Sequence, residues 1–143
     1  MLNFVDCFHC RIRGILFLGK KTGKEVITMV SASEEQIALL QDDTIIILHH
    51  LRISIHRLGY KYLTIAIPCY AINDTQSLSK EIYPYVARHL GYTNWHGIER
   101  AIRTVILDAW MQRDTDTWEE YFPKQQKVPT NKQFIATLAE RLR

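Results

Sequence analysis

The sequence predicts a mainly helical protein: a multi-helix domain with a helix-turn-helix, preceded by a short N-terminal β-hairpin and helix. Two patterns lead to this fold class. Apolar residues recur at helical spacing after about residue 43, whereas the first part of the chain holds short β-prone runs punctuated by glycines. A chain of 143 residues is long enough for one domain and a short appendage. We therefore assign residues 1–42 to an appendage and residues 43–143 to the helical domain.

Composition places the chain among ordinary globular proteins. Hydrophobic residues make up 47% and charged residues 23%, which argues against wholesale disorder. No apolar run approaches the ~20 residues that cross a bilayer, and the first residues lack the pattern of a secretory signal. Three unevenly placed cysteines are too few for a disulfide framework, so a reducing, cytoplasmic setting is expected. A net charge of +3 does not by itself establish a nucleic-acid partner.

The predicted β-hairpin joins two apolar, β-prone runs, Arg11–Leu18 and Glu25–Val30. The segment GKKTGK between them supplies two glycines for a turn. It lacks the spacing of a phosphate-binding loop, so a solvated turn is the preferred interpretation. A short helix is expected over Ser33–Leu40, because Ser31 and Glu34 have the spacing of a capping box.

A second helix is expected to begin at Asp42–Thr44 and to end at Gly59. The next segment, Tyr60–Ile72, fits a strand by its alternation and a helix by its length, and Pro68 would interrupt either. Its assignment stays open between the two. Asn73–Thr75 is expected to be a turn.

The clearest helical pattern begins at residue 78. Apolar residues recur on one face of residues 78–90, with a kink expected at Pro84 and an end at Gly91. A second helix follows at once. Two helices joined by a short turn that contains a glycine form the outline of a helix-turn-helix.

Thr93 or Asn94 can cap this second helix, which is expected over about residues 94–111. At about 100° per residue, its apolar and polar residues fall on opposite sides. The apolar side consists of Trp95, Ile98, Ala101, Ile102, Val105 and Ala109. The other side consists of His96, Glu99, Arg100, Arg103, Thr104 and Leu107.

In a helix-turn-helix, the N-terminal half of the second helix enters the major groove of DNA. Arginine there can bond guanine O6 and N7 together, and glutamate can accept a hydrogen bond from cytosine N4. An amphipathic surface helix with solvated charges has the same periodicity, so periodicity alone leaves both interpretations open.

The acidic segment Asp114–Glu120 is expected to end the helical pattern, with nearby aromatic residues anchoring it to the core. These anchors are Trp118, Tyr121 and Phe122. A last helix is expected to open at Pro129–Asn131, because Thr130 and Gln133 have capping-box spacing. Its buried stripe consists of Phe134, Ile135, Leu138 and Leu142.

Four segments carry a resemblance to a known family. They read IYPYVARHLG from Ile82, GIERAIR from Gly97, DAW from Asp108 and PTNKQFIATLAERLR from Pro129. Together they resemble the C-terminal effector domain of the stage-zero sporulation protein A, the response regulator that commits endospore-forming bacteria to sporulate. The resemblance covers residues 43–143. It implies an all-helical domain with a helix-turn-helix that regulates transcription.

The same resemblance implies the partners. They are double-stranded DNA, bound at a short element as a homodimer or as tandem copies, and the sigma factor of RNA polymerase. No membrane partner, cofactor or enzymatic activity is expected.

The resemblance also implies site residues. Glu99 and Arg100 match family residues that reach bases, and Arg103 matches a further basic position. The full set of expected DNA-binding residues is Lys80, Arg88, Thr93, Asn94, His96, Glu99, Arg100, Arg103 and Thr104. Trp118, Glu119 and Glu120 are the candidates for contact with the transcription machinery.

Two departures from the family pattern bear on function. Residues 1–42 are too few for the receiver domain of ~120 residues that the family carries, so control by receiver phosphorylation is not expected. The family usually has a Ser-Arg pair where this chain has His96 and Gly97. Losing one bidentate contact costs ~1–3 kcal/mol of discrimination between bases. This loss motivates an alternative function, a protein-interaction module that kept the effector fold and lost most sequence-specific DNA readout.

A metal site is an alternative interpretation of the N-terminal cysteines. Cys7, His9 and Cys10 form a C-x-x-C motif with an adjacent histidine, but a structural zinc site needs further ligands and no second pair follows. We interpret Cys7 and Cys10 as ordinary reduced cysteines. No Ser-His-Asp or paired-carboxylate arrangement stands out, so no catalytic residue is predicted.

Overall fold

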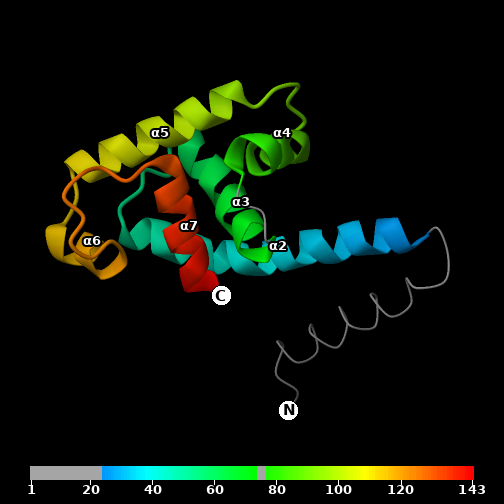
Figure 1. Cartoon of the computed structure of the whole chain (residues 1–143), viewed down its shortest axis with the longest axis horizontal. Coiled ribbons are helices and arrows are strands. Elements are labelled where there is room, and N and C mark those ends of the chain that lie inside the picture. The colour runs from blue at the N-terminus through cyan, green and yellow to red at the C-terminus, as the bar shows by residue number, and fades with distance from the viewer. Residues whose placement is uncertain (1–23, 74–76) are drawn as a thin grey trace, which may run out of the picture. The chain divides into compact units, whose positions relative to one another are not determined.

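The structure, a computed structural model, describes residues 24–73 and 77–143. Over these residues every regular element is helical, which confirms the mainly helical fold class (Figure 1). The helices are α2 (Lys24–His50), α3 (Leu58–Ile72), α4 (Tyr83–Leu90), α5 (His96–Met111), α6 (Thr115–Tyr121) and α7 (Asn131–Leu142), with a π-helical segment, η2 (Leu78–Ile82), leading into α4. α2 crosses the boundary between two compact units, the second of which spans Leu39–Arg143 and holds all the later helices.

α3 is the central helix of the second unit and packs against both α5 and α7 (Figure 1). It is buried on nearly all sides rather than along one stripe. A helix that is apolar all round lacks the periodicity that separates helix from strand, which explains why the sequence leaves Tyr60–Ile72 open. The helical interpretation is confirmed. Pro68 lies inside this helix, where burial of the whole segment offsets the ~3 kcal/mol that an internal proline costs.

α5 and α7 each pack one apolar stripe onto the core. The buried residues of α5 are Ile98, Ile102, Val105, Ile106 and Ala109. Those of α7 are Phe134, Ile135, Leu138 and Ala139. The predicted stripes are therefore confirmed in the main, although Trp95, Ala101 and Leu142 are only partly buried.

The predicted N-terminal β-hairpin is not supported. The prediction that Glu25–Val30 forms its second strand is wrong, because these residues lie inside α2. The short helix expected over Ser33–Leu40 is part of the same continuous helix. No glycine or proline interrupts α2, and a six-residue apolar run cannot distinguish a strand from a helix segment by itself. The first predicted strand, Arg11–Leu18, lies outside the described residues.

The helix expected from Asp42–Thr44 to Gly59 is also divided differently. α2 runs through its predicted start, and the Thr44 hydroxyl donates to the carbonyl of Leu40 at 2.7 Å instead of capping a new helix. α2 ends at His50, and a connection over residues 51–57 leads to α3. Arg52 in this connection has a positive φ of 58°.

The predicted pair of helices over residues 78–111 is present, with two differences. The first helix begins as the π-helical segment η2, and the change to α-helix falls just before Pro84, which lacks the N–H that a continuing ladder needs. Gly91 ends α4 with a φ of 76°, as expected. Thr93 and Asn94 do not cap α5, whose N-cap is Trp95 without a side-chain hydrogen bond.

Aromatic packing fixes the start of α5 in place of a polar cap. The Trp95 ring lies 5.6 Å from that of Tyr83 in α4 and stacks on His96 at 4.6 Å. Cap propensity favours the small polar residues of the turn, and it takes no account of this contact with α4.

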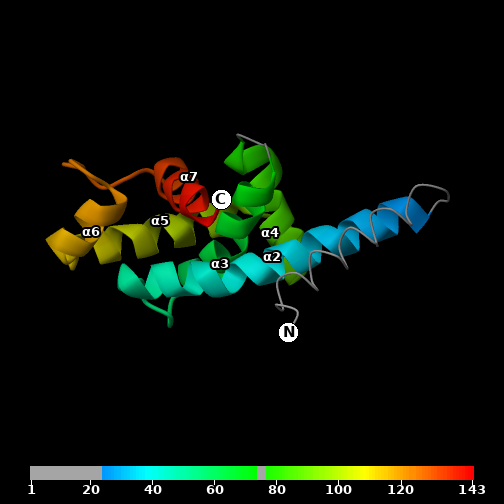
Figure 2. The ribbon, with the colours of Figure 1, turned by 90° about the horizontal axis from the view of Figure 1, so that it is seen from below.

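The acidic segment after α5 forms a helix, so the expectation that Asp114–Glu120 ends the helical pattern is wrong. Asp114 caps α6, its carboxylate accepting from the Thr117 N–H at 3.2 Å and from the Thr117 hydroxyl. Both ribbon views place α6 beside the C-terminal end of α5 (Figures 1 and 2). Trp118 is buried among the rings of Trp110, Phe122 and Phe134, which confirms its predicted anchoring role.

The start of α7 is as expected from the sequence. Thr130 and Gln133 form a capping box, in which the Thr130 hydroxyl accepts from the Gln133 N–H at 3.1 Å and the Gln133 side chain accepts from the Thr130 N–H at 2.9 Å. This local motif needs only residues three apart in sequence, which is why spacing was sufficient to predict it.

Replacing either of two helical glycines by alanine should change the stability of the protein, in opposite directions. A Cβ at Gly59 would overlap the Ala101 carbonyl oxygen and lie 2.7 Å from Cγ1 of Val105, whereas a Cβ at Gly97 would meet nothing within 4 Å. We expect Gly59→Ala to lower the free energy of unfolding by ~1–3 kcal/mol through overpacking. Gly97→Ala should raise it by ~0.5–1 kcal/mol through reduced backbone entropy of the unfolded chain. Chemical denaturation of both variants measures this, and equal changes would contradict the close approach of α3 and α5.

The cap of α6 should make stability depend on pH. Hydrogen bonds from the Thr117 side chain and backbone, followed by the charges of Arg52 and His50, lower the pKa of Asp114. A lowered folded-state pKa contributes stability above the unfolded value of about 3.9, and this contribution is lost as the pH falls through the folded value. Asp114→Asn keeps a capping oxygen that does not titrate. Denaturation should show the wild type losing stability relative to this variant below about pH 4, and a constant difference would contradict the prediction.

Candidate nucleic-acid interface

The outer side of α5 carries most of the residues that the sequence singles out. His96, Glu99, Arg100, Thr104 and Leu107 are exposed there, as the periodicity predicts. The apolar stripe on the opposite side is buried against the core. The helix therefore presents a cation, a carboxylate and an imidazole together at its N-terminal half.

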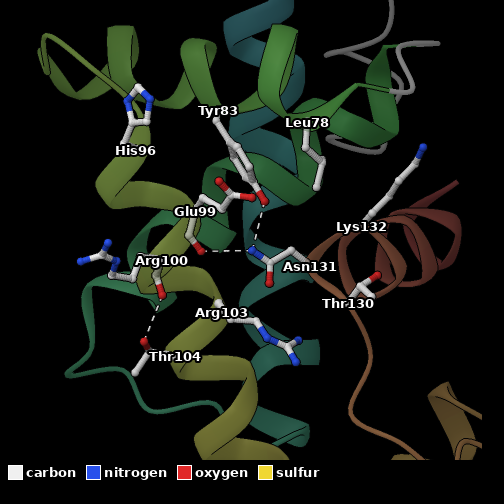
Figure 3. Close-up of a pocket in the computed structure, with 10 residues that line it drawn as sticks. All are labelled: Leu78, Tyr83, His96, Glu99, Arg100, Arg103, Thr104, Thr130, Asn131 and Lys132. Carbon is white, nitrogen blue, oxygen red and sulfur yellow. Dashed lines mark hydrogen bonds between the residues drawn. The ribbon is translucent and has the colours of Figure 1, made fainter.

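Arg103 is the exception on this side of α5. It is half-buried, and its Nη1 donates to the carbonyl oxygen of Pro129 at 2.7 Å. Figure 3 shows Arg100 and Arg103 leaving α5 in different directions, with Arg103 turned toward the segment before α7. Arg103 thus lies on the predicted polar side of α5 but is only partly exposed, because the Pro129 carbonyl lies within hydrogen-bond reach.

A groove lies between the outer side of α5 and the start of α7 (Figure 3). We call it the α5–α7 groove. It encloses about 690 Å³ and is lined by Leu78, Tyr83, His96, Glu99, Arg100, Arg103, Thr104, Thr130, Asn131 and Lys132. It brings five predicted site residues of α5 together with α7 residues that the sequence analysis did not assign to the site.

Asn131, the first residue of α7, links the walls of the α5–α7 groove. Its Nδ2 donates to the Tyr83 hydroxyl at 3.1 Å and to the Glu99 carbonyl at 3.1 Å (Figure 3). Burial raises the pKa of Tyr83, whose hydroxyl therefore stays protonated at neutral pH. One side chain thus ties α4, α5 and α7 together. The sequence identified Asn131 only as part of a helix start, because its partners lie far away in the chain.

A second hollow of about 420 Å³ flanks α5 on the side of the connection before α3. It is lined by His56, Arg57, Leu58, Gly59, Gly97, Arg100, Ala101, Thr104 and Val105. His56 and Arg57 were not predicted as site residues. The only available signal was a basic pair directly before a helix start, which has no characteristic spacing. Arg57 also pairs with Asp108 of α5, at 3.2 Å between Nη2 and Oδ2.

The turn before α5 forms a third hollow, of about 500 Å³. Thr93 and Asn94 line it together with Gly97, and both are exposed. Their predicted capping role is wrong, and they lie beside the first turn of α5.

Two predicted site residues lie apart from these hollows. Lys80 is exposed on η2 and lines none of the three. Arg88 is exposed on α4 and lines a separate hollow of about 230 Å³ with Glu81 and Cys69. The structure therefore does not bring Arg88 together with the outer side of α5.

The charge around α5 is strongly biased. The α5–α7 groove and the hollow beside His56 are lined by Arg57, Arg100, Arg103 and Lys132, and Glu99 is the one carboxylate among the described residues that line them. Asp108 of α5, which pairs with Arg57, lies outside these two linings. A surface of this kind attracts phosphate groups.

The residues proposed to face the transcription machinery divide into two groups. Trp118 is 2% exposed and cannot reach a partner from the aromatic cluster. Glu119 and Glu120 are exposed on α6. The Glu119 carboxylate accepts from the Lys124 N–H at 2.8 Å, and the Glu120 carbonyl accepts from Arg141. Burial thus restricts the candidate partner contacts to the two glutamates.

Other kinds of site find no support among the described residues. Within residues 24–73 and 77–143, no three histidine, cysteine or acidic side chains are arranged to hold a metal ion. The N-terminal Cys7, His9 and Cys10 lie outside that part of the chain. None of the described helices combines the length and the apolar character that crossing a bilayer requires.

Comparison with known families agrees with this geometry. The family model described as "Sporulation initiation factor Spo0A C terminal" matches residues 44–142. The match spans the end of α2 and all the later helices, and so includes every residue that lines the α5–α7 groove. Because it covers more than half of the sequence, the chain belongs to the family of Spo0A C-terminal effector domains, which bind DNA and regulate transcription.

Proposed function

We propose that this chain is a transcriptional regulator that reads a short element of double-stranded DNA with α4 and α5 as a helix-turn-helix. The observation that supports this best is the outward presentation of Arg100 and Glu99 on α5, whose opposite side is buried. α4 and the turn at Gly91 support the start of α5 from behind. The N-terminal half of α5 enters the major groove, as in other helix-turn-helix proteins.

In this proposal, the exposed residues at the start of α5 contact the bases. Arg100 can donate to guanine O6 and N7 together, and Glu99 can accept from cytosine N4. Asn131 holds the Glu99 backbone from the other side, which keeps this turn of α5 fixed during docking. His96 stacks on Trp95, so its ring is held rather than free to rotate.

The side chains that flank α5 contact the phosphates in this proposal. His56 and Arg57 lie on one side, and Thr93 and Asn94 lie in the turn that precedes the helix. Lys80 adds a more distant positive charge. Contacts of this kind fix the orientation of a protein on the duplex and carry little sequence information.

Arg103 has a structural role in this proposal. Its guanidinium holds the segment before α7 through Pro129, so it stabilises the wall of the α5–α7 groove instead of reading a base. The proposal also covers the protein partner, the mode of DNA binding and the cellular setting. Glu119 and Glu120 are the exposed candidates for contact with a sigma factor, DNA is bound as a dimer or as tandem copies, and the setting is the cytoplasm.

Two substitutions separate base readout from phosphate contact. Arg100→Ala should reduce the preference for the cognate element over scrambled DNA by about 10- to 100-fold, since a bidentate pair contributes ~1–3 kcal/mol of discrimination. Lys80→Ala should weaken binding to both DNAs alike and reduce the slope of log K against log salt by about 0.9. Fluorescence anisotropy with an element selected from a random library measures both quantities.

The same titrations test the proposed function itself. Wild-type protein that binds DNA without any preference at low salt, or that does not bind at all, would contradict it. Either result would favour the alternative of a protein-interaction module, which the open position at Gly97 motivates.

The two arginines of α5 should contribute differently to stability. Arg103→Ala removes a charged hydrogen bond to a carbonyl and should lower the free energy of unfolding by ~1–2 kcal/mol. Arg100→Ala, at an exposed position of the same helix, should change it by less than ~0.5 kcal/mol. Chemical denaturation compares the two directly. Equal losses of stability would show that Arg103 does not hold the segment before α7.

A further inference from the structure

The start of α7 lies in a fixed position relative to the reading side of α5. Arg103 donates to Pro129 at 2.7 Å, and Asn131 donates to the Glu99 carbonyl at 3.1 Å. Asn131 also reaches Tyr83 of α4, and the capping box orders the first turn of α7 internally. These bonds join residues between 26 and 48 positions apart in sequence. The backbone of this turn is therefore held in place relative to α5.

Lys132 is the side chain carried at that position. It is exposed, lines the α5–α7 groove and forms no ion pair with a carboxylate of the described residues. Figure 3 shows it across the groove from Arg100, on the far side of Asn131. A solvated ammonium group on a rigid support is suited to contact a phosphate, which it meets as a point charge.

The position of Lys132 can be compared with the geometry of the DNA major groove. A helix in the major groove, which is about 12 Å wide, has a phosphate backbone on each side. His56 and Arg57 flank α5 on one side, through the hollow that they share with Arg100. The α5–α7 groove flanks it on the other, with Lys132 on its outer wall. The linings on the two sides of α5 thus each carry positively charged side chains, of which Arg57 is paired with Asp108.

We propose that Lys132 contacts a phosphate of the DNA strand opposite the one faced by His56 and Arg57, and that Asn131 is the positioning residue for this contact. α7 then forms part of the DNA-binding surface, in addition to the helix-turn-helix. This inference depends on the proposed function, because it requires a duplex seated on α5.

The test uses the full chain and two DNA duplexes, the selected element and a scrambled version. Lys132→Ala should weaken binding to both duplexes by roughly 5- to 10-fold near 0.1 M salt and reduce the slope of log K against log salt by about 0.9. The matched control is Lys127→Ala, which removes the same charge from an exposed lysine outside the α5–α7 groove. This control should leave the slope unchanged.

A double-mutant cycle tests the role of Asn131. If Asn131 positions Lys132, the loss caused by Lys132→Ala should shrink by at least half when Asn131→Ala is already present. Circular dichroism of the Asn131→Ala protein confirms that it is folded. A merely structural role for Asn131 would leave the effect of Lys132→Ala unchanged in this background, and that result would overturn the positioning role.

The outcomes distinguish this inference from the proposed function. Wild-type protein that fails to bind DNA contradicts both. Wild-type protein that binds with preference, together with a Lys132→Ala slope equal to that of the wild type, overturns the α7 contact alone. A loss confined to the selected element also overturns it, because a phosphate contact acts on all sequences alike.

Discussion

The close packing of α3 against α5 determines what the rest of this domain can do. At Gly59 the backbone of α3 comes so near Ala101 of α5 that no side chain fits between them. The buried side of α5 rests on this contact, so its rotation about its own axis is fixed. Because the packed interior is not continuously deformable, the exposed side can only be the one that carries Arg100.

α7 then divides the polar side of α5 into two parts with different roles. Arg103 is drawn to the Pro129 carbonyl, and the Glu99 carbonyl is bound by Asn131, while the side chain of Arg100 stays exposed. Two arginines three residues apart on one helix thus differ in exposure and in hydrogen bonding because of a segment from elsewhere in the chain. Charge and helical position alone do not separate them. The separation depends on which backbone oxygen lies within reach.

Sequence patterns predicted the local parts of this architecture and missed the long-range ones. The stripes of α5 and α7, the end of α4 at Gly91 and the Thr130 capping box follow from residues a few positions apart, and the structure confirms them. α3 has no single apolar face, so its period carried no signal. The start of α5 depends on ring stacking between Trp95 and Tyr83, and the α5–α7 groove depends on Asn131. Neither contact leaves a pattern in a single sequence.

The open position at Gly97 affects recognition more than folding. A side chain there would meet no neighbour, so the absence of the arginine that the family resemblance implies leaves no cavity and no unpaired group in the fold. In the proposed binding mode, the chain has one donor fewer near the bases, next to Arg100. Affinity for a duplex would then rest more heavily on the proposed phosphate contacts that flank α5, from His56 and Arg57 on one side and Lys132 on the other. Binding built in this way depends strongly on salt and discriminates less between sequences, since phosphates are the same in every element.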